Sequence, residues 1–310
     1  MAILVTGGAG MVGSHVAELL SKRGDSVVIL DNFETGRKEH LVNLENAKFI
    51  QGSVSDRQLL ETIVSNYAID KFVHTAASYA VSTEWQKQIE TNTLGTANIA
   101  ELAKQVSGRV IYFQTALCYG EDPKIQPVPL EYPRQPVRSS YAISKTAGEF
   151  YLEQSGADFV TFRLANIIGP RNLSGPLPIF FKRLTEGMPC RITKSRRDFV
   201  DVRDLADSVV KAVDGTGNGA YHFSSGGDIE ITALFEEICA QLNLEKQPDF
   251  EIVEDSSGPK SILLDPSRTQ SDFALTRFRT LSETVAGAID YYKNFGVTRE
   301  VTHLKVAHEK

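Results

Sequence analysis

The chain has 310 residues, of which 42% are hydrophobic and 23% charged, and these are ordinary proportions for a globular protein with a sizeable core. The formal net charge of -6 excludes the broad basic surface by which proteins attract nucleic acid. The three cysteines, Cys118, Cys190 and Cys239, fit neither a disulfide framework nor a zinc site, and no apolar run approaches the roughly 18 to 20 residues that span a bilayer. We therefore expect a cytoplasmic protein without a metal site, a membrane span or a secretory leader.

Short apolar runs alternate with helical patterns along the first half of the chain. The expected strands are Ile3–Thr6, Val27–Asp31, Lys48–Gln51, Lys71–Thr75, Arg109–Gln114 and Phe159–Leu164. Because these runs are short and bounded by polar turns, they suit strands that are buried on both faces. The alternation predicts an α/β fold with a doubly wound parallel sheet of the Rossmann type.

The character of the sequence changes after residue 165. A Pro- and Gly-rich stretch, GPRNLSGPLP, is followed by the helical pattern FFKRLTEG and then by the charged segment SRRDFVDVRDLAD. We predict a first domain over residues 1–165, with return segments near 198–225, and a smaller C-terminal α/β domain over 166–310. Ala220–Ser224 is expected to form another strand, and Thr232–Leu242 an amphipathic helix.

Three glycines, Gly7, Gly10 and Gly13, follow the first expected strand and open a helix in the segment TGGAGMVGSH. Glycines at this place let backbone amides approach a diphosphate, although they also occur for packing. Asp31 ends the second expected strand, where a carboxylate accepts hydrogen bonds from the adenosine ribose and repels a 2′-phosphate, although a strand-end cap is the structural alternative. NAD is therefore favoured, with NADP as the lesser alternative because Arg37 and a lysine follow closely.

Tyr141 and Lys145 stand in the segment YAISK at the start of a helical pattern, and their spacing puts a phenol and an ammonium on one helix face. A phenol with a pKa near ~10 is a poor base at neutral pH, but a nearby ammonium and a positive nicotinamide both favour the phenolate. Tyr141 could then remove a hydroxyl proton while hydride leaves the same carbon. By itself this spacing is common and equally fits a solvated helix face, so its weight depends on the glycine motif.

Taken in order, these segments resemble a known family. The matching segments are TGGAGMVGSH, DNFETG, HTAAS, NTLGTAN, FQTALCYG, SSYAISK, RLANIIGPR, RRDFVDVRD and, more weakly, LLDPSR. They are similar to the landmarks of the extended short-chain dehydrogenase/reductase superfamily, in its nucleotide-sugar epimerase/dehydratase branch. The resemblance implies NAD as the cofactor, a UDP-linked sugar as the substrate, a C-terminal domain that binds the substrate, and a homodimer packed through the helix that carries Tyr141.

The resemblance also implies which residues form the site. The implied catalytic residues are Thr115, Tyr141 and Lys145. The hydroxyl of Thr115 would form a hydrogen bond with the sugar O4. Without the family, Thr115 would be taken as a strand-end hydroxyl that bonds the backbone. The implied cofactor-binding residues are Gly7, Gly10, Met11, Val12, Gly13, Asp31, Asn32, Ser53, Val54, Thr75, Ala76, Ala77, Asn92, Tyr141 and Lys145. The implied substrate-binding residues are Ser78, Thr115, Asn166, Leu177 and Arg197.

Some of these implied contacts are open. The family commonly has an aspartate at the position of Ser53, where it contacts the adenine amine, so this contact is in doubt. Asn166 and Arg197 match the positions that hold the diphosphate, but the arginine segment also fits a lattice of surface ion pairs. Leu177 and Phe181 are expected to line the nucleotide pocket or to belong to the core.

The residues after Thr115 select among the family's reactions. The family's 4,6-dehydratases carry an Asp–Glu pair there and its decarboxylases a nearby glutamate, whereas this chain has Ala116 and Leu117. The resemblance therefore implies a 4-epimerase that works through a 4-keto intermediate. Leu173, where uronate-specific members carry an arginine, disfavours a uronic acid, and Ile262 leaves room for an N-acetyl group. The expected substrates are UDP-glucose and UDP-galactose or their N-acetylhexosamine forms, in polysaccharide biosynthesis.

Two alternatives remain. A 4,6-dehydratase, a reductase or another epimerase could use the same scaffold with catalytic groups from other positions. The alternative of a different class is a non-catalytic regulator that binds dinucleotide, and the joint presence of Thr115, Tyr141 and Lys145 argues against it.

Overall fold

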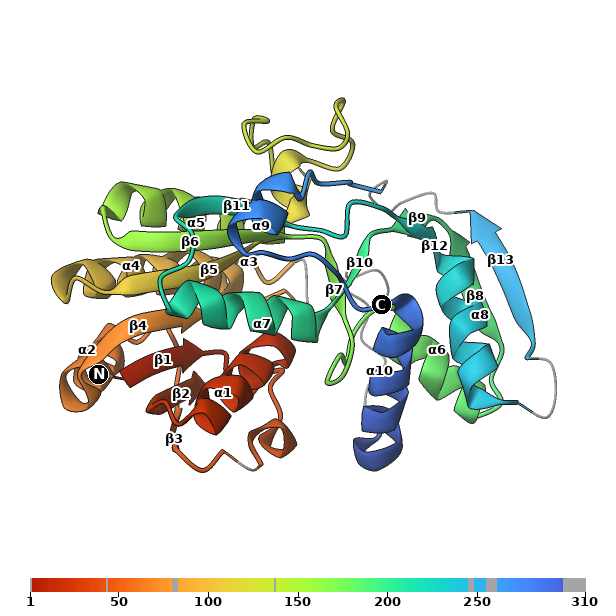
Figure 1. Ribbon diagram of the computed structural model, residues 1–310, viewed down its shortest axis with the longest axis horizontal. Helices are drawn as coiled ribbons and strands as arrows, with labels where there is room; N and C mark the ends of the chain where they lie inside the picture. Colours follow the sequence, from red (N-terminus) through yellow and green to blue (C-terminus); the bar gives the residue numbers. More distant parts are fainter. Residues whose placement is uncertain are drawn as a thin grey trace.

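The chain folds around one large sheet with helices on both faces (Figure 1). The computed structural model describes residues 2–42, 44–79, 83–136, 138–244, 248–254 and 261–297. The strands of the large sheet are β1 (Ala2–Thr6), β2 (Val27–Asp31), β3 (Ala47–Gln51), β4 (Ile69–His74), β5 (Arg109–Thr115), β6 (Asp158–Leu164) and β11 (Gly219–Phe223). Their order is β11-β6-β5-β4-β1-β2-β3, and every neighbouring pair is parallel. The predicted α/β fold with a doubly wound parallel sheet is confirmed.

The strands follow the predicted ranges closely, because burial on both faces makes their sequences continuous apolar runs. β1 and β2 are buried at every position. Alternate residues of β1 supply two separate cores, since Ile3 and Val5 belong to one apolar cluster, and Ala2 and Leu4 to the other. β3 is one of the two edge strands, and its residues are exposed or only partly buried.

The helices that cover the sheet bury these two cores. α1 (Met11–Arg23) and α7 (Val202–Val213) pack together on one face, and α2 (Arg57–Tyr67), α4 (Gly95–Gln105) and α5 (Ser140–Ser155) lie on the other (Figure 1). Shorter elements lie in the connections: the 3-10 turns η1 (Lys38–Leu41) and η3 (Ala116–Tyr119), α3 (Trp85–Gln88), the π-helical turn η2 (Ile89–Leu94) and α9 (Ser267–Asp272).

A smaller lobe is built from three helices and three short strand pairs. The helices are α6 (Pro176–Thr185), α8 (Ile231–Leu242) and α10 (Leu281–Phe295). The strands are β7 (Asn166–Ile168), β8 (Cys190–Lys194), β9 (Arg196–Arg197), β10 (Phe199–Asp201), β12 (Ile229–Glu230) and β13 (Phe250–Glu254), which pair as β10–β7, β12–β9 and β13–β8. A third apolar cluster fills the lobe. Between β10 and β12 the chain returns to the large sheet through α7 and β11, whereas the division into two domains at residue 165 stays a prediction.

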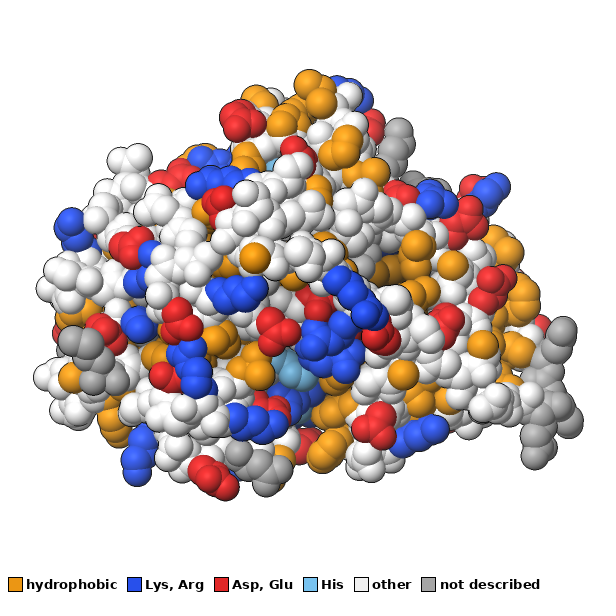
Figure 2. All heavy atoms as spheres, in the orientation of Figure 1, with side chains coloured by type: hydrophobic (Ala, Val, Ile, Leu, Met, Phe, Trp, Pro, Cys, Tyr) orange, Lys and Arg blue, Asp and Glu red, His pale blue; other side chains and the backbone are white. Residues whose placement is uncertain are grey.

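On the face shown in Figure 2, acidic and basic side chains are interspersed, which agrees with the small net charge of -6. In the part of the chain that the structure describes, no helix combines the length and the apolar character needed to cross a membrane.

Four histidines with lowered pKa values, three of them buried and His15 partly buried, predict that acid weakens the fold. Burial lowers the pKa of His15, His40 and His222 to about 4 and that of His74 to about 3. In the unfolded chain these groups bind protons near the ordinary value of 6.5, so below that pH the unfolded state binds more protons and the folded state loses stability. We expect the free energy of unfolding to fall by about 1 kcal/mol per histidine between roughly pH 7.5 and pH 5.5.

Urea denaturation at several pH values measures this dependence. The variant His74→Asn should show a shallower dependence on pH, because one buried titrating group is gone. An unchanged free energy of unfolding across this range would contradict the prediction.

Candidate active site

A cavity of about 770 Å³ opens at the carboxyl ends of the sheet strands, between the large sheet and the smaller lobe. The turns after β1, β2, β4 and β5 form one wall, and the segment from β7 to the start of α6 forms part of the other. In a doubly wound sheet this edge is where ligands bind, because the strand order reverses there. The predicted site residues on the cavity wall are Gly7, Gly10, Met11, Val12, Asp31, Asn32, Ser53, Val54, Thr75, Ala76, Ala77, Ser78, Thr115, Tyr141, Lys145, Asn166 and Arg197.

Three predicted site residues lie behind the wall. Gly13 is buried, and a Cβ there would lie 2.5 Å from the carbonyl oxygen of Gly7, so it permits close packing. Asn92 is fully buried in η2, where its side chain accepts a hydrogen bond from Ser78 N at 2.8 Å and donates one to Ser78 O at 2.9 Å. Leu177 is fully buried in the third apolar cluster, so the structure places it in the core and not in the pocket.

The glycine turn fits a dinucleotide. Gly7 has φ +66, and a Cβ there would lie 2.7 Å from both the N and the Cα atom of Ala76, so no side chain can occupy this position without displacing the β4 loop. Helix α1 follows at once, and its N-cap Gly10 makes no side-chain cap hydrogen bond. The first amides of the helix therefore have no side-chain cap, and Gly10, Met11 and Val12 line the cavity, which suits a diphosphate.

Asp31 joins the turn to the end of β2. Its two carboxylate oxygens accept hydrogen bonds from Ala9 N at 2.9 Å and from Phe33 N at 2.7 Å. Burial raises the pKa of this carboxyl group, while the two amides oppose the rise. These bonds fix the carboxylate in the cavity wall, and each oxygen keeps a lone pair that can accept a hydrogen bond from a ribose hydroxyl.

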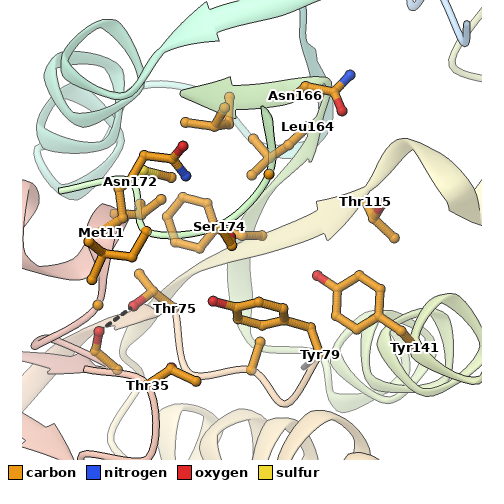
Figure 3. A pocket seen from close by; sticks show the side chains of 18 of the residues that line it. Met11, Thr35, Thr75, Tyr79, Thr115, Tyr141, Leu164, Asn166, Asn172 and Ser174 are labelled. Carbon is orange, nitrogen blue, oxygen red and sulfur yellow. Dashed lines mark hydrogen bonds between the residues drawn. The ribbon is translucent and has the colours of Figure 1, made fainter. Parts of the chain in front are cut away.

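The reactive end of the cavity contains Thr115 and Tyr141, whose side chains face the same space from β5 and α5 (Figure 3). The hydroxyl of Thr115 accepts a hydrogen bond from Leu117 N at 3.2 Å, which leaves its own proton free to be donated. Tyr141 stands in the first turn of α5, where the helix dipole favours a negative charge. Ser139 caps this helix by accepting a bond from Ala142 N at 3.2 Å.

The electrostatics of Tyr141 differ from the prediction made from spacing alone. Burial, and then the neighbouring hydroxyl of Tyr79, raise the pKa of Tyr141, so the residue is a neutral phenol in this structure. Lys145 does not reverse this effect, because its ammonium lies 4.0 Å from the ring centroid of Tyr112 and burial lowers its own pKa to about 7. A phenolate at Tyr141 therefore requires an additional positive charge.

A buried ion-pair network supports this end of the cavity from behind. Glu149, one turn after Lys145, is fully buried and accepts hydrogen bonds from Arg163 Nε at 3.0 Å and Gln114 Nε2 at 3.1 Å. Gln114 in turn accepts a hydrogen bond from Thr115 N at 2.8 Å. The carboxylate thus fixes the backbone of Thr115, and its charge raises the pKa of Lys145 against the effect of burial.

The part of the cavity wall from the smaller lobe carries several cations. Arg197 lies on it, whereas Arg196 makes an ion pair with Asp228 at 2.7 Å. Asn166 donates a hydrogen bond to Asp198 O at 3.2 Å. Several other residues of the wall carried no predicted role, namely Thr35, His40, Tyr79, Arg171, Asn172, Ser174, Ile179, Phe180 and Arg191.

Of these, Tyr79 had a detectable signal, because a residue shortly after the carboxyl end of a central strand belongs to the binding edge. Ile179 and Phe180 follow Leu177 by two and three positions, so the sequence located the correct segment and missed its cavity-facing side.

Acidic groups are distributed unevenly around the cavity. Among the described lining residues the carboxylates are Asp31, the last residue of β2, and Glu34 in the loop that follows it. Within the described ranges, no group of three or more His, Cys, Asp and Glu residues could hold a metal ion. The described reactive end therefore offers hydroxyl groups and an amine.

The chain matches the NAD dependent epimerase/dehydratase family over residues 3–223. It is similar to the crystal structure of the Bordetella bronchiseptica enzyme WbmH in complex with NAD+, with 53% identity, a TM-score of 0.93, and coverage of 96% of this chain and 99% of that one. The B. bronchiseptica enzyme WbmG in complex with NAD and UDP is 35% identical, with a TM-score of 0.88 and coverage of 98% of this chain and 97% of that one.

Curated sequence relatives carry more than one activity. A putative UDP-glucose 4-epimerase of Methanocaldococcus jannaschii is 30% identical over an alignment of 266 residues, with coverage of 80% of this chain and 85% of that protein. UDP-glucuronic acid decarboxylase 1 of Arabidopsis thaliana is 32% identical over an alignment of 262 residues, with coverage of 76% of this chain and 57% of that protein.

The fit of the glycine turn leads to a prediction for Gly7→Ala. The new Cβ would lie 2.7 Å from backbone atoms of Ala76 in a left-handed conformation. We expect NAD affinity, measured by titration calorimetry, to fall by at least about tenfold, since backbone strain of this kind costs ~1–3 kcal/mol.

Gly24→Ala is the matched control, because Gly24 also has a positive φ of +95 and a Cβ there would meet nothing within 4 Å. Equal losses of NAD affinity in the two variants would show that strain alone, and not the contact with Ala76, explains the effect.

Proposed function

The chain belongs to the NAD dependent epimerase/dehydratase family, and we propose that this NAD-dependent enzyme, which modifies a nucleotide sugar, is a 4-epimerase. The observation that carries the proposal is the distribution of chemistry around the cavity. Thr115, Tyr141 and Lys145 lie at the reactive end, while the described carboxylates of the wall, Asp31 and Glu34, lie at the end of β2 and in the loop after it.

This distribution distinguishes among the reactions of the family. A 4,6-dehydration also removes and returns protons around C5 and C6, which calls for an additional acid/base group beside the sugar. In this chain Ala116 and Leu117 follow Thr115 on the cavity wall. Oxidation at C4 and reduction from the opposite face require only the phenol, the threonine hydroxyl and the cofactor.

The proposed mechanism assigns a task to each of the three side chains. Tyr141 accepts the proton of the sugar O4 hydroxyl. It returns this proton after the 4-keto sugar has rotated in the site and presents its opposite face. Thr115 holds O4 by donating the proton that its bond from Leu117 N leaves free. Bound NAD supplies the acceptor and donor of the C4 hydride, and its positive ring supplies the charge that a phenolate at Tyr141 requires.

Lys145 has a separate task in this scheme. With a pKa of about 7, it can lose or gain a proton at neutral pH without a large energetic cost. Its place one turn after Tyr141 allows it to bind the cofactor ribose. Glu149 and Gln114 keep this arrangement in position from behind the wall.

A UDP-linked hexose is the proposed substrate. WbmG was solved with UDP, and a guanidinium such as that of Arg197 on the wall of this cavity suits a diphosphate. Leu173 and Ile262 also line the cavity. An apolar side chain at Leu173 offers no ion pair to a uronate, and Ile262 leaves space for an N-acetyl group. UDP-glucose and UDP-N-acetylglucosamine are therefore the leading candidates, with polysaccharide biosynthesis as the proposed context.

The test is to incubate the purified protein with UDP-glucose, UDP-N-acetylglucosamine and UDP-glucuronate, with and without NAD. Chromatography with mass detection should show a new product of unchanged mass from a hexose donor. We expect Tyr141→Phe to lower kcat by roughly 10²- to 10⁴-fold, since general acid–base catalysis contributes that much.

The possible products separate the alternatives. A product lighter by water would overturn the epimerase proposal in favour of a dehydratase, and one lighter by carbon dioxide in favour of a decarboxylase. Full activity in Tyr141→Phe would refute the assigned mechanism, and no turnover of any nucleotide sugar would favour the non-catalytic regulator.

We also propose a homodimer, formed through α5 and the neighbouring helices. Ile143 and Tyr151 on α5 are 51% and 56% exposed, and Trp85 and Ile89 on the adjoining segment α3–η2 are 66% and 56% exposed. These segments pack side by side on one face of the sheet. A large apolar area of this kind favours association with a second copy.

The dimer predicts that Ile143→Glu yields a monomer, because a charge would be buried without a partner. Light scattering after size-exclusion chromatography measures the mass. Ile252→Glu is the control, since Ile252 on β13 is 55% exposed and lies outside this face. A wild-type monomer, or dissociation in both variants, would refute the proposed interface.

A further inference from the structure

The backbone of Ala9, in the glycine turn, is held from two sides. Ala9 is fully buried, and its N–H donates a hydrogen bond to Asp31 at 2.9 Å. Its carbonyl oxygen accepts two hydrogen bonds, one from Arg37 N at 3.0 Å and one from Nδ1 of His40 at 2.7 Å. A carbonyl oxygen has two lone pairs, so this acceptor is saturated. The conformation of the turn is therefore tied to the segment after β2 and to one imidazole ring.

The imidazole of His40 has one tautomer that fits its partners. Nδ1 must carry the proton, because the carbonyl of Ala9 can only accept. Burial lowers the pKa of His40 to about 4, so the ring is neutral at neutral pH and Nε2 is an acceptor. Nε2 lies 2.7 Å from the hydroxyl of Tyr291, which therefore donates its proton to the ring. The hydrogen bonds run in one direction, from Tyr291 through His40 to Ala9.

Tyr291 connects this link to the smaller lobe. It belongs to α10, which packs with α6 and α8 around the third apolar cluster (Figure 1). Its ring stacks on that of Phe295, with centroids 4.9 Å apart and planes at 24°. The next residue, Tyr292, donates a hydrogen bond to Asn172 O at 2.6 Å. The hydroxyl of Tyr291 thus extends from a helix that its own contacts hold in place.

The carbonyl of Ala9 belongs to the peptide that leads into α1. This carbonyl and the N–H of Gly10 lie in one planar peptide group, and Gly10 is the N-cap of the helix. The N–H of Gly10 donates to Gly7 O at 3.0 Å and closes the turn. A bond that holds the Ala9 carbonyl therefore also holds the N-cap. The next amides of α1 are the backbone donors that suit a diphosphate, so their placement depends on this peptide.

We propose that His40 and Tyr291 are positioning residues of the cofactor site: through them, α10 holds the Ala9 carbonyl and keeps the N-terminus of α1 in the arrangement that binds NAD. None of the described residues on the cavity wall belongs to α10, so this helix acts on the cofactor site only through the link. The inference rests on NAD as the cofactor and not on the reaction.

The experiment measures NAD affinity by titration calorimetry, without any sugar. His40→Leu removes the hydrogen bonds to both partners, and we expect the Kd for NAD to rise on the order of tenfold. Tyr291→Phe keeps the ring that stacks on Phe295 and removes only the hydroxyl. We expect a smaller rise of about threefold to fivefold, because the bond from His40 to Ala9 remains.

Two further variants test whether the link is the cause. The double variant His40→Leu/Tyr291→Phe should bind NAD no more weakly than His40→Leu alone, because Tyr291 acts through His40. His40→Asn places an amide N–H near the position of Nδ1, so it can keep the bond to Ala9 while it loses the one to Tyr291. It should therefore bind NAD about as well as Tyr291→Phe, which a general disturbance of the fold at His40 would not allow.

Tyr221→Phe is the matched control, since it removes a buried tyrosine hydroxyl that bonds Asp272 at 2.8 Å, and Tyr221 is absent from the cavity wall. A Kd within about twofold of the wild-type value in His40→Leu or in Tyr291→Phe would overturn the proposal. Additive losses in the double variant, or an equal loss in Tyr221→Phe, would overturn it as well. Because no sugar is present, a failed epimerase assay leaves this result unaffected.

Discussion

The close approach of Gly7 to Ala76 is the constraint on which the whole site depends. Two backbone segments from neighbouring strands, β1 and β4, meet so tightly that a Cβ on Gly7 would lie 2.7 Å from the backbone of Ala76. This contact sets the start of α1, whose first residues line the cavity, and it sets the base from which Ser78 and Tyr79 extend. Binding of the cofactor and placement of the substrate wall follow from the same local geometry.

The other end of the cavity depends on a buried charge. Glu149 has no exposed surface, and its ion pair with Arg163 lies behind the catalytic wall. Through Gln114 it orients Thr115, and through its charge it opposes the fall in the pKa of Lys145. A buried carboxylate is costly unless it is paired, so this network has one well-defined arrangement, and the catalytic side chains inherit that order.

The sequence predicted most of the fold because the signals were local. Each predicted strand of the large sheet is present with small changes at its ends, and β11 and α8 lie close to the ranges expected for them. Leu177 lies in the core, one of the two places left open for it, and the electrostatics of Tyr141 differ from the expectation based on spacing. The apolar pattern of a helix shows that it has a buried side, but not which of its buried residues face a cavity. The i, i+4 spacing places Lys145 near Tyr141, but it does not reveal that burial is the largest influence on the pKa of both residues.

By itself, the sequence determined the order of strands and helices, the preference for NAD and the three catalytic candidates. These depend on apolar runs, glycine spacing, one carboxylate at a strand end and residues one helical turn apart, all of which lie within short segments. Only the tertiary structure decided that the rings of Tyr79 and Tyr141 meet edge-on, that Glu149 reaches Gln114, and that the described carboxylates of the cavity wall lie at and just after the end of β2, whereas Thr115 lies at the end of β5. The physical reason is that parallel strands bring the turns at their carboxyl ends to one edge, and the packing of the smaller lobe against that edge then selects which side chains come into contact.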